Sequence, residues 1–224
     1  RDVLMIGLAS GSWAQVIANN PAVNSLTVVE INRGYLELIA EQPDVQTVLR
    51  NPKVTIVTDD GRRWLNRHPE RRFDAVVSNT TWHFRANVTN LLSTEFLGLV
   101  RQHLKPGGIF FYNTTNSRRV QRTACLAFPF GARFTNHMVV SDAPIAWDFA
   151  RWRDVLGSYA IDGKNEFDLG KADDRAQLDS LLQEYGPDGP MIEDCKTLLQ
   201  DTADRNPVTD DNMGTEWRTY FRPE

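Results

Sequence analysis

Hydrophobic and polar positions alternate along residues 1–115 in blocks that predict strands and helices in turn. Short apolar runs are typical of strands covered on both faces, and they lie at Val3–Gly7, Leu26–Ile31, Val54–Val57, Phe73–Ser78 and Ile109–Asn113. The segments between them predict helices at Trp13–Asn19, Gly34–Glu41, Arg62–Arg67 and Ser93–Leu104, with Ser93 as an N-cap. Strands that alternate with helices at this spacing predict parallel βαβ units, and therefore a doubly wound sheet.

The pattern is weaker after Thr115. We expect helices at Arg118–Ala127, Ala172–Tyr185 and Ile192–Ala203, and a strand at Arg133–Val140 that forms an antiparallel edge of the sheet. The Gly-Pro-Asp-Gly-Pro stretch at residues 186–190 predicts a turn or linker between the last two helices. The sequence thus predicts a Rossmann-like domain over residues 1–145 and a helical C-terminal extension over residues 146–224 that packs on it.

Length and charge exclude several classes of protein. A chain of 224 residues with 41% hydrophobic and 24% charged residues is ordinary for one globular domain. A net charge of -4 argues against a nucleic-acid surface. The sequence has no apolar run long enough to cross a membrane and no visible signal peptide, so we expect a cytoplasmic location.

The cysteines and the first residues also bear on cellular context. Cys125 and Cys195 are far apart, without a CxxC pair or a His at ligand spacing. This disfavours a zinc site or a disulfide framework and fits a reducing compartment. The chain begins directly on an apolar run after Arg1-Asp2, so we expect a fragment of a longer polypeptide.

Three features follow predicted strands, where a doubly wound sheet binds ligands. The first is the glycine-containing loop Gly7–Ser12, in which Gly7, Ser10 and Gly11 allow close approach to a ligand near a helix N-terminus. The loop is not GxGxxG, so it does not imply a dinucleotide pyrophosphate. Its alternative interpretation is a tight turn without a ligand.

The other two features are acidic. Glu30 ends the second strand, where a carboxylate can accept both ribose hydroxyls; a solvated strand end is the alternative. Asp59-Asp60-Gly61 follows the third strand, where a carboxylate can accept the exocyclic amine of adenine. The alternative for either aspartate is a helix N-cap.

Several motifs carry a family resemblance. The segments VLMIGLASGS, LTVVEIN, TDDGRRWL, FDAVVSNTT and LKPGGIFFYNT together resemble the spermidine synthase (aminopropyltransferase) branch of the class I methyltransferase-like fold. The resemblance is looser over Phe128–Ile145, and the stretch 208–212 (VTDDN) resembles a terminal motif of the same branch. It implies that Gly7, Gly11, Glu30, Asp60 and Gly61 hold an adenosyl nucleoside such as decarboxylated S-adenosylmethionine or methylthioadenosine. The co-substrate implied is S-adenosylmethionine or its decarboxylated form.

The chain also departs from the family pattern. Leu8 and Ala9 replace glycines of the first loop, and Ser10 takes the position of an aspartate. Asn79 stands where the family has the aspartate that helps to deprotonate the attacking amine, and Trp82 replaces a second acid. An amide does not accept a proton at neutral pH, so the family mechanism is not available as written. The β-hairpin region that precedes this domain in the family is absent from the sequence.

Other residues are candidates for the missing roles. His83 has a suitable pKa for a base, although a histidine between aromatic residues also fits simple packing. Asp59 is the second candidate base, and Asp142, Asp210 and Asp211 are remoter ones. Asn79 and Thr80 are candidates for hydrogen bonds to the adenine or the donor tail, and the loop Trp82–Asn90 is expected to cover the pocket mouth.

The resemblance implies a transferase that moves an aminopropyl or methyl group to a polyamine-like amine acceptor, without a metal. A non-catalytic nucleoside- or polyamine-sensing domain of a larger membrane protein is the alternative. The "NTTWHFRA" segment resembles long membrane proteins that carry such a domain at their cytoplasmic end, which predicts a tether to a membrane domain outside this chain. The family also implies a homodimer.

Overall fold

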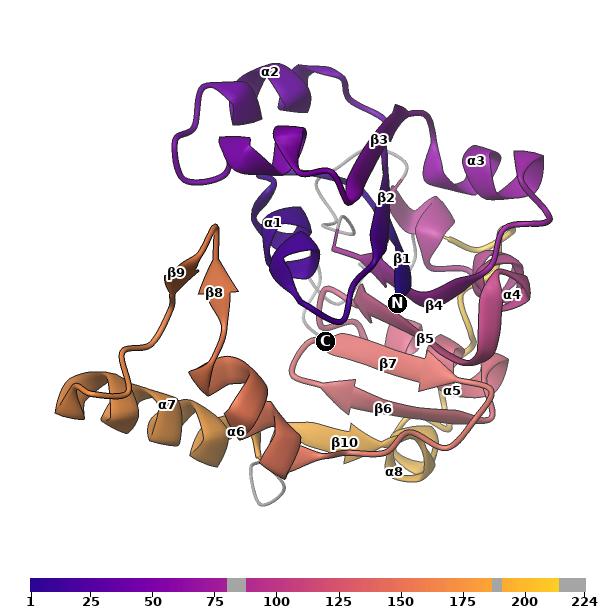
Figure 1. Ribbon diagram of the computed structural model, residues 1–224. Helices are drawn as coiled ribbons and strands as arrows, with labels where there is room; N and C mark the ends of the chain where they lie inside the picture. The colour runs from indigo at the N-terminus through magenta and orange to yellow at the C-terminus, as the bar shows by residue number, and fades with distance from the viewer. Residues whose placement is uncertain (80–87, 187–190, 214–224) are drawn as a thin grey trace.

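The computed structural model describes residues 1–79, 88–186 and 191–213. Its centre is an eight-stranded sheet of order β10-β6-β7-β5-β4-β1-β2-β3 (Figure 1). The parallel strands are β1 (Asp2–Ile6), β2 (Ser25–Glu30), β3 (Val54–Thr58), β4 (Phe73–Ser78) and β5 (Leu104–Asn113). The antiparallel edge is formed by β6 (Phe130–Phe134), β7 (His137–Ser141) and β10 (Ile192–Asp194). The predicted doubly wound, mostly parallel sheet with an antiparallel edge is confirmed.

Helices cover both faces of the sheet. One face is packed against α1 (Ser12–Asn19), α2 (Gly34–Ala40) and the 3-10 turn η1 (Gln46–Arg50). The other face is packed against α3 (Gly61–Arg67), α4 (Thr94–Gln102), α5 (Arg118–Ala127) and α8 (Cys195–Asp201). A second 3-10 turn, η2 (Val88–Leu91), precedes α4. Ser93 caps α4 as predicted, because its side chain accepts a hydrogen bond from the Phe96 amide.

Each face has its own hydrophobic core. Alternate residues of one strand serve the two cores, so that Leu4 and Ile6 face α3 to α5 while Val3 and Met5 face α1 and α2. All four side chains are buried. Burial on both faces explains why the sequence of β1 is apolar throughout rather than alternating.

The predicted strand Arg133–Val140 is wrong as a single element. The chain makes a hairpin there, in which β6 pairs with β7 on either side of Thr135-Asn136. Thr135 has a positive φ of 57°, a left-handed conformation that a continuous strand does not contain. The turn lies at this point because Phe134 and His137 become cross-strand partners.

The C-terminal part is less helical than predicted. It contains α6 (Phe149–Gly157), a small hairpin of β8 (Ala160–Ile161) and β9 (Lys164–Asn165), and α7 (Ala172–Tyr185). The expected helix Ile192–Ala203 is wrong in its first three residues, which form β10 against β6 before α8 begins. The extension therefore completes the sheet as well as covering it.

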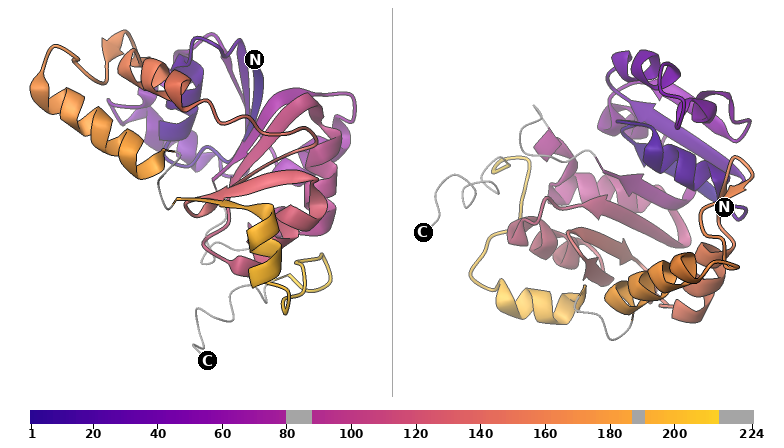
Figure 2. Two further views of the ribbon diagram at one scale, coloured as in Figure 1. Left: turned by 90° about the horizontal axis from the view of Figure 1, so that it is seen from below. Right: turned by 90° about the vertical axis from the view of Figure 1, so that its left-hand side faces the viewer.

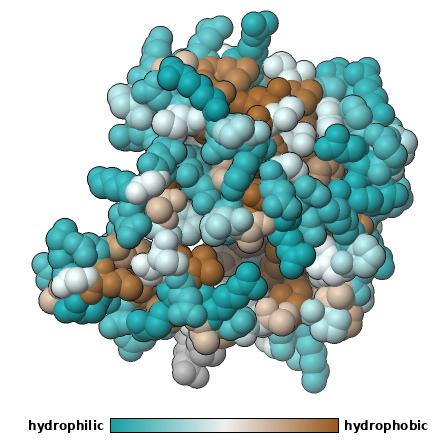
Figure 3. Space-filling view, viewed as in Figure 1, coloured by the Kyte–Doolittle hydropathy of each residue, from teal (hydrophilic) through white to brown (hydrophobic). Residues whose placement is uncertain are grey.

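The helices α6 and α7 form a lobe beside the sheet (Figure 2). The β8–β9 hairpin connects this lobe to α1 and η1, and Asp162 at its tip accepts a hydrogen bond from Thr47 (2.7 Å). A cavity of about 690 Å³ lies between the lobe and the sheet edge, lined by aromatic side chains that include Phe134, Trp152 and Tyr185. Apolar side chains border this hollow in the space-filling view (Figure 3).

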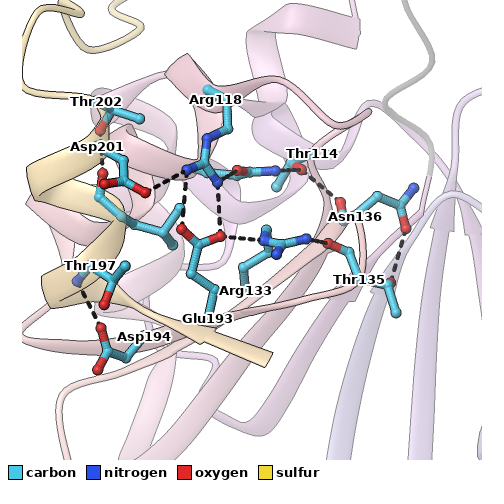
Figure 4. Close-up of polar contacts among 12 residues, drawn as sticks. Thr114, Arg118, Arg133, Thr135, Asn136, Glu193, Asp194, Thr197, Asp201 and Thr202 are labelled. Carbon is cyan, nitrogen blue, oxygen red and sulfur yellow. Dashed lines mark hydrogen bonds and ion pairs between the residues drawn. The ribbon is translucent and has the colours of Figure 1, made fainter. Parts of the chain in front are cut away.

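The expectation that the cysteines do not form a disulfide is wrong. Cys125 on α5 and Cys195 at the start of α8 are bonded, with their Cα atoms 5.3 Å apart and a sequence separation of 70. Arg118 on α5 adds an ionic connection to the same region, because it donates to Glu193 of β10, which also accepts from Arg133 (both 2.8 Å; Figure 4). The segment of β10 and α8 is thus attached to α5 by a covalent and an ionic link.

No helix in the described part of the chain combines the length and hydrophobicity needed to span a bilayer.

Candidate functional site

The candidate residues lie together at the carboxyl edge of the sheet. The loop after β1, Glu30 at the end of β2, Asp59 after β3 and Asn79 after β4 all lie at this edge, because the four strands are parallel and in register. The strand order reverses direction between β1 and β4. A doubly wound sheet binds ligands at such a switch point.

The loop between β1 and α1 turns tightly. Gly7, Ala9 and Gly11 all have positive φ angles (86°, 48° and 82°), a region in which glycine carries no steric cost. A Cβ atom on Gly11 would lie 3.1 Å from the Cδ1 atom of Ile39. The positive φ angles explain the glycines at positions 7 and 11, and the tight packing is a second reason at position 11. Ser10 lies at the exposed side of the loop, where its hydroxyl is 3.0 Å from that of Ser12.

Glu30 holds this loop in place. Its carboxylate is buried, with 3% exposure. The Oε2 atom accepts from the Leu8 amide (2.5 Å) and the Ala9 amide (3.4 Å), and Oε1 accepts from the Asn32 amide (2.7 Å). A carboxylate has about four acceptor positions, so about one remains. A ribose that binds through both hydroxyls therefore competes with the long bond from Ala9.

The two aspartates after β3 have different partners. Asp60 is the N-cap of α3, and its side chain accepts from the Arg63 amide (2.8 Å). Asp59 forms ion pairs with Arg63 and Arg67. Burial raises the pKa of Asp59, but the hydrogen bond from Arg63 and the other nearby donors and charges leave that pKa below its ordinary value. A carboxyl group with a lowered pKa is a weak base at neutral pH.

Gly61 brings the start of α3 against β1. A Cβ atom at this position would lie 2.5 Å from the Cγ2 atom of Ile6, closer than real contacts allow. The glycine of Asp60-Gly61 therefore has a packing role that the sequence alone did not show. It also fixes the distance between the loop after β3 and the loop after β1, the two sides of the proposed nucleoside site.

Asn79 belongs to a network of amides at the end of β4 and β5. Its Oδ1 atom accepts from Nδ2 of Asn113 (2.9 Å), and Oδ1 of Asn113 accepts from the Thr115 amide (2.6 Å) and from Asn136 (3.3 Å). None of these amide groups can take up a proton at neutral pH. The network can orient a polar ligand but does not supply a general base.

His137 is a site residue that the sequence analysis missed. It pairs with Asn113 across the β5–β7 ladder, and its ring stacks with those of Trp13 (5.4 Å) and Phe111 (4.9 Å). Burial lowers the pKa of His137 to about 4, so its imidazole is neutral at physiological pH. Its Nε2 atom is buried and has no hydrogen-bond partner among the described residues. The Thr135-Asn136 turn determines where β7 begins, but the pairing of β7 with β5 places His137 opposite Asn113, and no local pattern in the sequence indicates that pairing.

Several predicted site residues are not brought to this edge or lie outside the description. Thr80, His83 and most of the loop Trp82–Asn90 fall within residues 80–87, outside the described residues. Asp142 follows the far end of β7 and pairs with Arg101 (2.6 Å), which removes it from the candidate site. No group of three or more His, Cys, Asp or Glu side chains in the described ranges is placed to hold a metal ion.

The topology and the loop after β1 define a Rossmann-like α/β domain. Within that class, residues 1–125 match the family model of the spermine/spermidine synthase domain. Because this match covers more than half of the chain, the protein belongs to the spermine/spermidine synthase family.

Curated relatives are similar over part of their length. The polyamine aminopropyltransferase of Streptococcus pneumoniae serotype 4 is 29% identical over 153 residues, which are 64% of this chain and 53% of the relative. That of Mycobacterium tuberculosis is 33% identical over 113 residues, 49% of this chain and 22% of the relative. Spermidine synthase 1 of Pisum sativum is 27% identical over 110 residues, 49% of this chain and 33% of the relative. The chain thus spans about half or less of these relatives.

Solved structures show the same fold. A crystal structure of spermidine synthase in complex with the transition state analogue AdoDATO has a TM-score of 0.63 at 15% identity, over 83% of this chain and 69% of that chain. Spermidine synthase from Thermotoga maritima has a TM-score of 0.61 at 15% identity, over 83% of this chain and 68% of that chain. The structural likeness extends beyond the family match into the C-terminal part.

Proposed function

We propose that this domain is an aminopropyltransferase that uses decarboxylated S-adenosylmethionine and a polyamine-like amine acceptor. The observation that carries the proposal is the family match over residues 1–125, which includes every loop at the carboxyl edge from β1 to β5. The names of the relatives and the analogue in the neighbouring structure support it. The nucleoside would bind between the loop of Gly7, Ser10 and Gly11, Glu30, and Asp60-Gly61.

The reaction would be a direct displacement. The acceptor nitrogen attacks the carbon beside the sulfonium, a C–N bond forms, and the C–S bond breaks with its electron pair going to sulfur. The products are a lengthened amine and methylthioadenosine. Because the sulfonium is already a good leaving group, positioning would supply most of the rate.

The acceptor amine must lose a proton, and the described residues of the site supply no strong base for this step. By the family resemblance Asn79 stands in place of the base, and it is an amide. Asp59 is paired with two arginines. His83 remains the proposed base. His137 is a poor second, because burial lowers its pKa to about 4 and encloses its Nε2 atom. We propose that Asn79 and Thr80 hydrogen-bond the donor rather than take part in proton transfer.

Calorimetric titration tests the ligand, and mass spectrometry tests the reaction. We expect the chain to bind decarboxylated S-adenosylmethionine more tightly than S-adenosylmethionine, and to form an aminopropylated product with putrescine. A preference for the carboxylated donor would instead indicate methyl transfer. Binding without product would indicate a nucleoside or polyamine sensor, and no binding by a folded sample would overturn the proposal.

Cellular location and assembly are proposed from the sequence. A cytoplasmic location, a membrane tether and a homodimer stay predictions. The Cys125–Cys195 bond offers a test of the first, because disulfides are rare in the reducing cytosol. A pair that is oxidised in intact cells would argue against a cytoplasmic location.

A further inference from the structure

The segment Pro207–Met213, here named the C-terminal clasp, crosses the helices that follow β3, β4 and β5. Val208 is fully buried. Its amide donates to Oγ1 of Thr123 on α5 (2.8 Å), and its carbonyl accepts from the amide of Thr94 at the start of α4 (2.9 Å). One residue of the clasp thus connects two helices.

Arg119 at the start of α5 holds the first part of the clasp. Its guanidinium donates to the carbonyls of Asn206 (2.9 Å) and Pro207 (3.1 Å) and to Oδ1 of Asn212 (3.1 Å). Asn212 in turn donates from Nδ2 to the Pro207 carbonyl (3.0 Å). These bonds give the clasp a defined conformation although it contains no strand or helix.

Asp210 is the centre of the second part. Both of its carboxylate oxygens accept from Arg62 on α3 (2.8 and 2.5 Å), and Oδ1 also accepts from Ser93, the N-cap of α4 (2.6 Å). Its own amide donates to Oε2 of Glu95 (3.0 Å). The bidentate pair with Arg62 has a fixed geometry that a single contact lacks.

Arg62 connects the clasp to the proposed nucleoside site. It directly follows Asp60-Gly61, and Gly61 has no free space against Ile6 of β1. Arg62 also donates to the carbonyl of Asn90, in the turn before α4 (3.3 Å). The single carboxylate of Asp210 therefore joins the start of α3, the turn before α4 and the clasp at the carboxyl edge of the sheet.

We propose that Asp210 is a positioning residue for nucleoside binding, which acts through Arg62 on the loop Asp60-Gly61. The inference rests on the proposed function. Asp210 lies far along the chain and has no direct contact with the described residues of the nucleoside site. It is connected to that site through Arg62. The ion pair is partly exposed (25% on the Arg62 side and 35% on the Asp210 side), so its effect on stability and its effect on geometry have to be measured separately.

The chain supplies a matched control at the next position. Asp211 is exposed, and no hydrogen bond or ion pair of its side chain is seen among the described residues. Asp210→Asn and Asp211→Asn change the net charge equally, and only the first weakens the contact with Arg62. Arg62→Lys is a second variant, which keeps the charge and removes the bidentate geometry.

The experiment combines calorimetry with hydrogen exchange on the full chain, using methylthioadenosine as the probe. We expect Asp210→Asn and Arg62→Lys to raise the Kd about 5- to 20-fold, the range of a modest coupling between sites, with Asp211→Asn unchanged. Without ligand, Asp210→Asn should exchange faster at residues 61–66 and 90–96. With ligand, the wild type should exchange more slowly across residues 207–213, because coupling is reciprocal.

Two results would overturn the inference, and they differ from each other. If Asp210→Asn melts at a lower temperature but binds methylthioadenosine with the wild-type Kd, the clasp is only structural and the proposed function is unaffected. If the folded wild type binds no nucleoside, the proposed function fails and the inference fails with it.

Discussion

At the scale of single residues, the carboxyl edge combines anchored polar groups with one unusual histidine. Glu30 accepts from three backbone amides, so its first role is to hold the loop after β1. Asn79 is joined to Asn113, so its side-chain amide has a partner in the fold. The Nε2 atom of His137 is buried and has no partner among the described residues. Such an atom costs free energy unless a ligand or a water molecule binds it.

Protonation of His137 should make stability depend on pH. Its pKa is about 4 in the folded protein because of burial, against about 6.5 when unfolded. The groups in contact with the ring, Trp13, Phe111 and Thr135, carry no charge. Between these two pKa values the unfolded state binds more protons than the folded state. The contribution of His137 to the free energy of unfolding is therefore fully present above about pH 6.5 and is lost as the pH falls toward 4.

We expect His137→Phe to remove about 1–3 kcal/mol of this pH dependence. The measurement is urea unfolding of both proteins at pH 7.5, 5.5 and 4.5. The contribution of other groups, including His103, whose pKa is also lowered by burial, is common to both proteins and cancels in the difference. A difference that stays constant with pH would show that His137 is not the group responsible.

At the scale of elements, close packing sets how the loops approach each other. The start of α3 lies on β1 because residue 61 has no side chain. The elements that follow β3, β4 and β5 are held together by the clasp. The geometry of the candidate site therefore depends on contacts between elements as much as on the loops.

Gly61→Ala should destabilise the protein. The new methyl group would overlap Cγ2 of Ile6, on a β-branched side chain in a central strand, and overpacking of this kind costs about 1–3 kcal/mol. Gly98→Ala on α4 is the control, because its Cβ would meet nothing within 4 Å and alanine should stabilise the helix by roughly 0.5–1 kcal/mol. Thermal melts of the two variants should shift in opposite directions; a shared direction would contradict the packing argument.

At the scale of the whole molecule, contacts between residues far apart in sequence hold the C-terminal part of the chain against the sheet. The chain returns to the sheet edge through β10, and α8 then packs on α5. The disulfide and the Arg118–Glu193–Arg133 contacts reinforce this closure. The C-terminal extension is therefore part of the sheet domain as well as an addition to it.

Reduction of the disulfide should lower the free energy of unfolding by about 2–4 kcal/mol, since a long loop in the unfolded state is no longer closed. A chain of this size would melt about 5–15 °C lower. The measurement is a thermal melt with and without dithiothreitol. The double variant Cys125→Ala, Cys195→Ala should melt near the reduced wild type and should not respond to the reductant; a response would mean that the reductant acts elsewhere.

The sequence alone determined the order of the βαβ units and the residues that follow each parallel strand, because these depend on local periodicity and on glycine and proline positions. From that order alone, Gly7, Glu30, Asp59, Asp60 and Asn79 were expected at one edge, and the structure places them there. Parallel strands in a doubly wound sheet have few alternative arrangements.

Tertiary structure decided the features that depend on pairing across long stretches of chain. The pairing of β7 with β5 places His137 beside Asn113, the strand β10 brings Cys195 to Cys125, and the clasp brings Asp210 to Arg62. Each of these contacts joins segments that have no local pattern in common. Register, packing and charge pairing between distant segments select them, so the local pattern of the chain does not contain them.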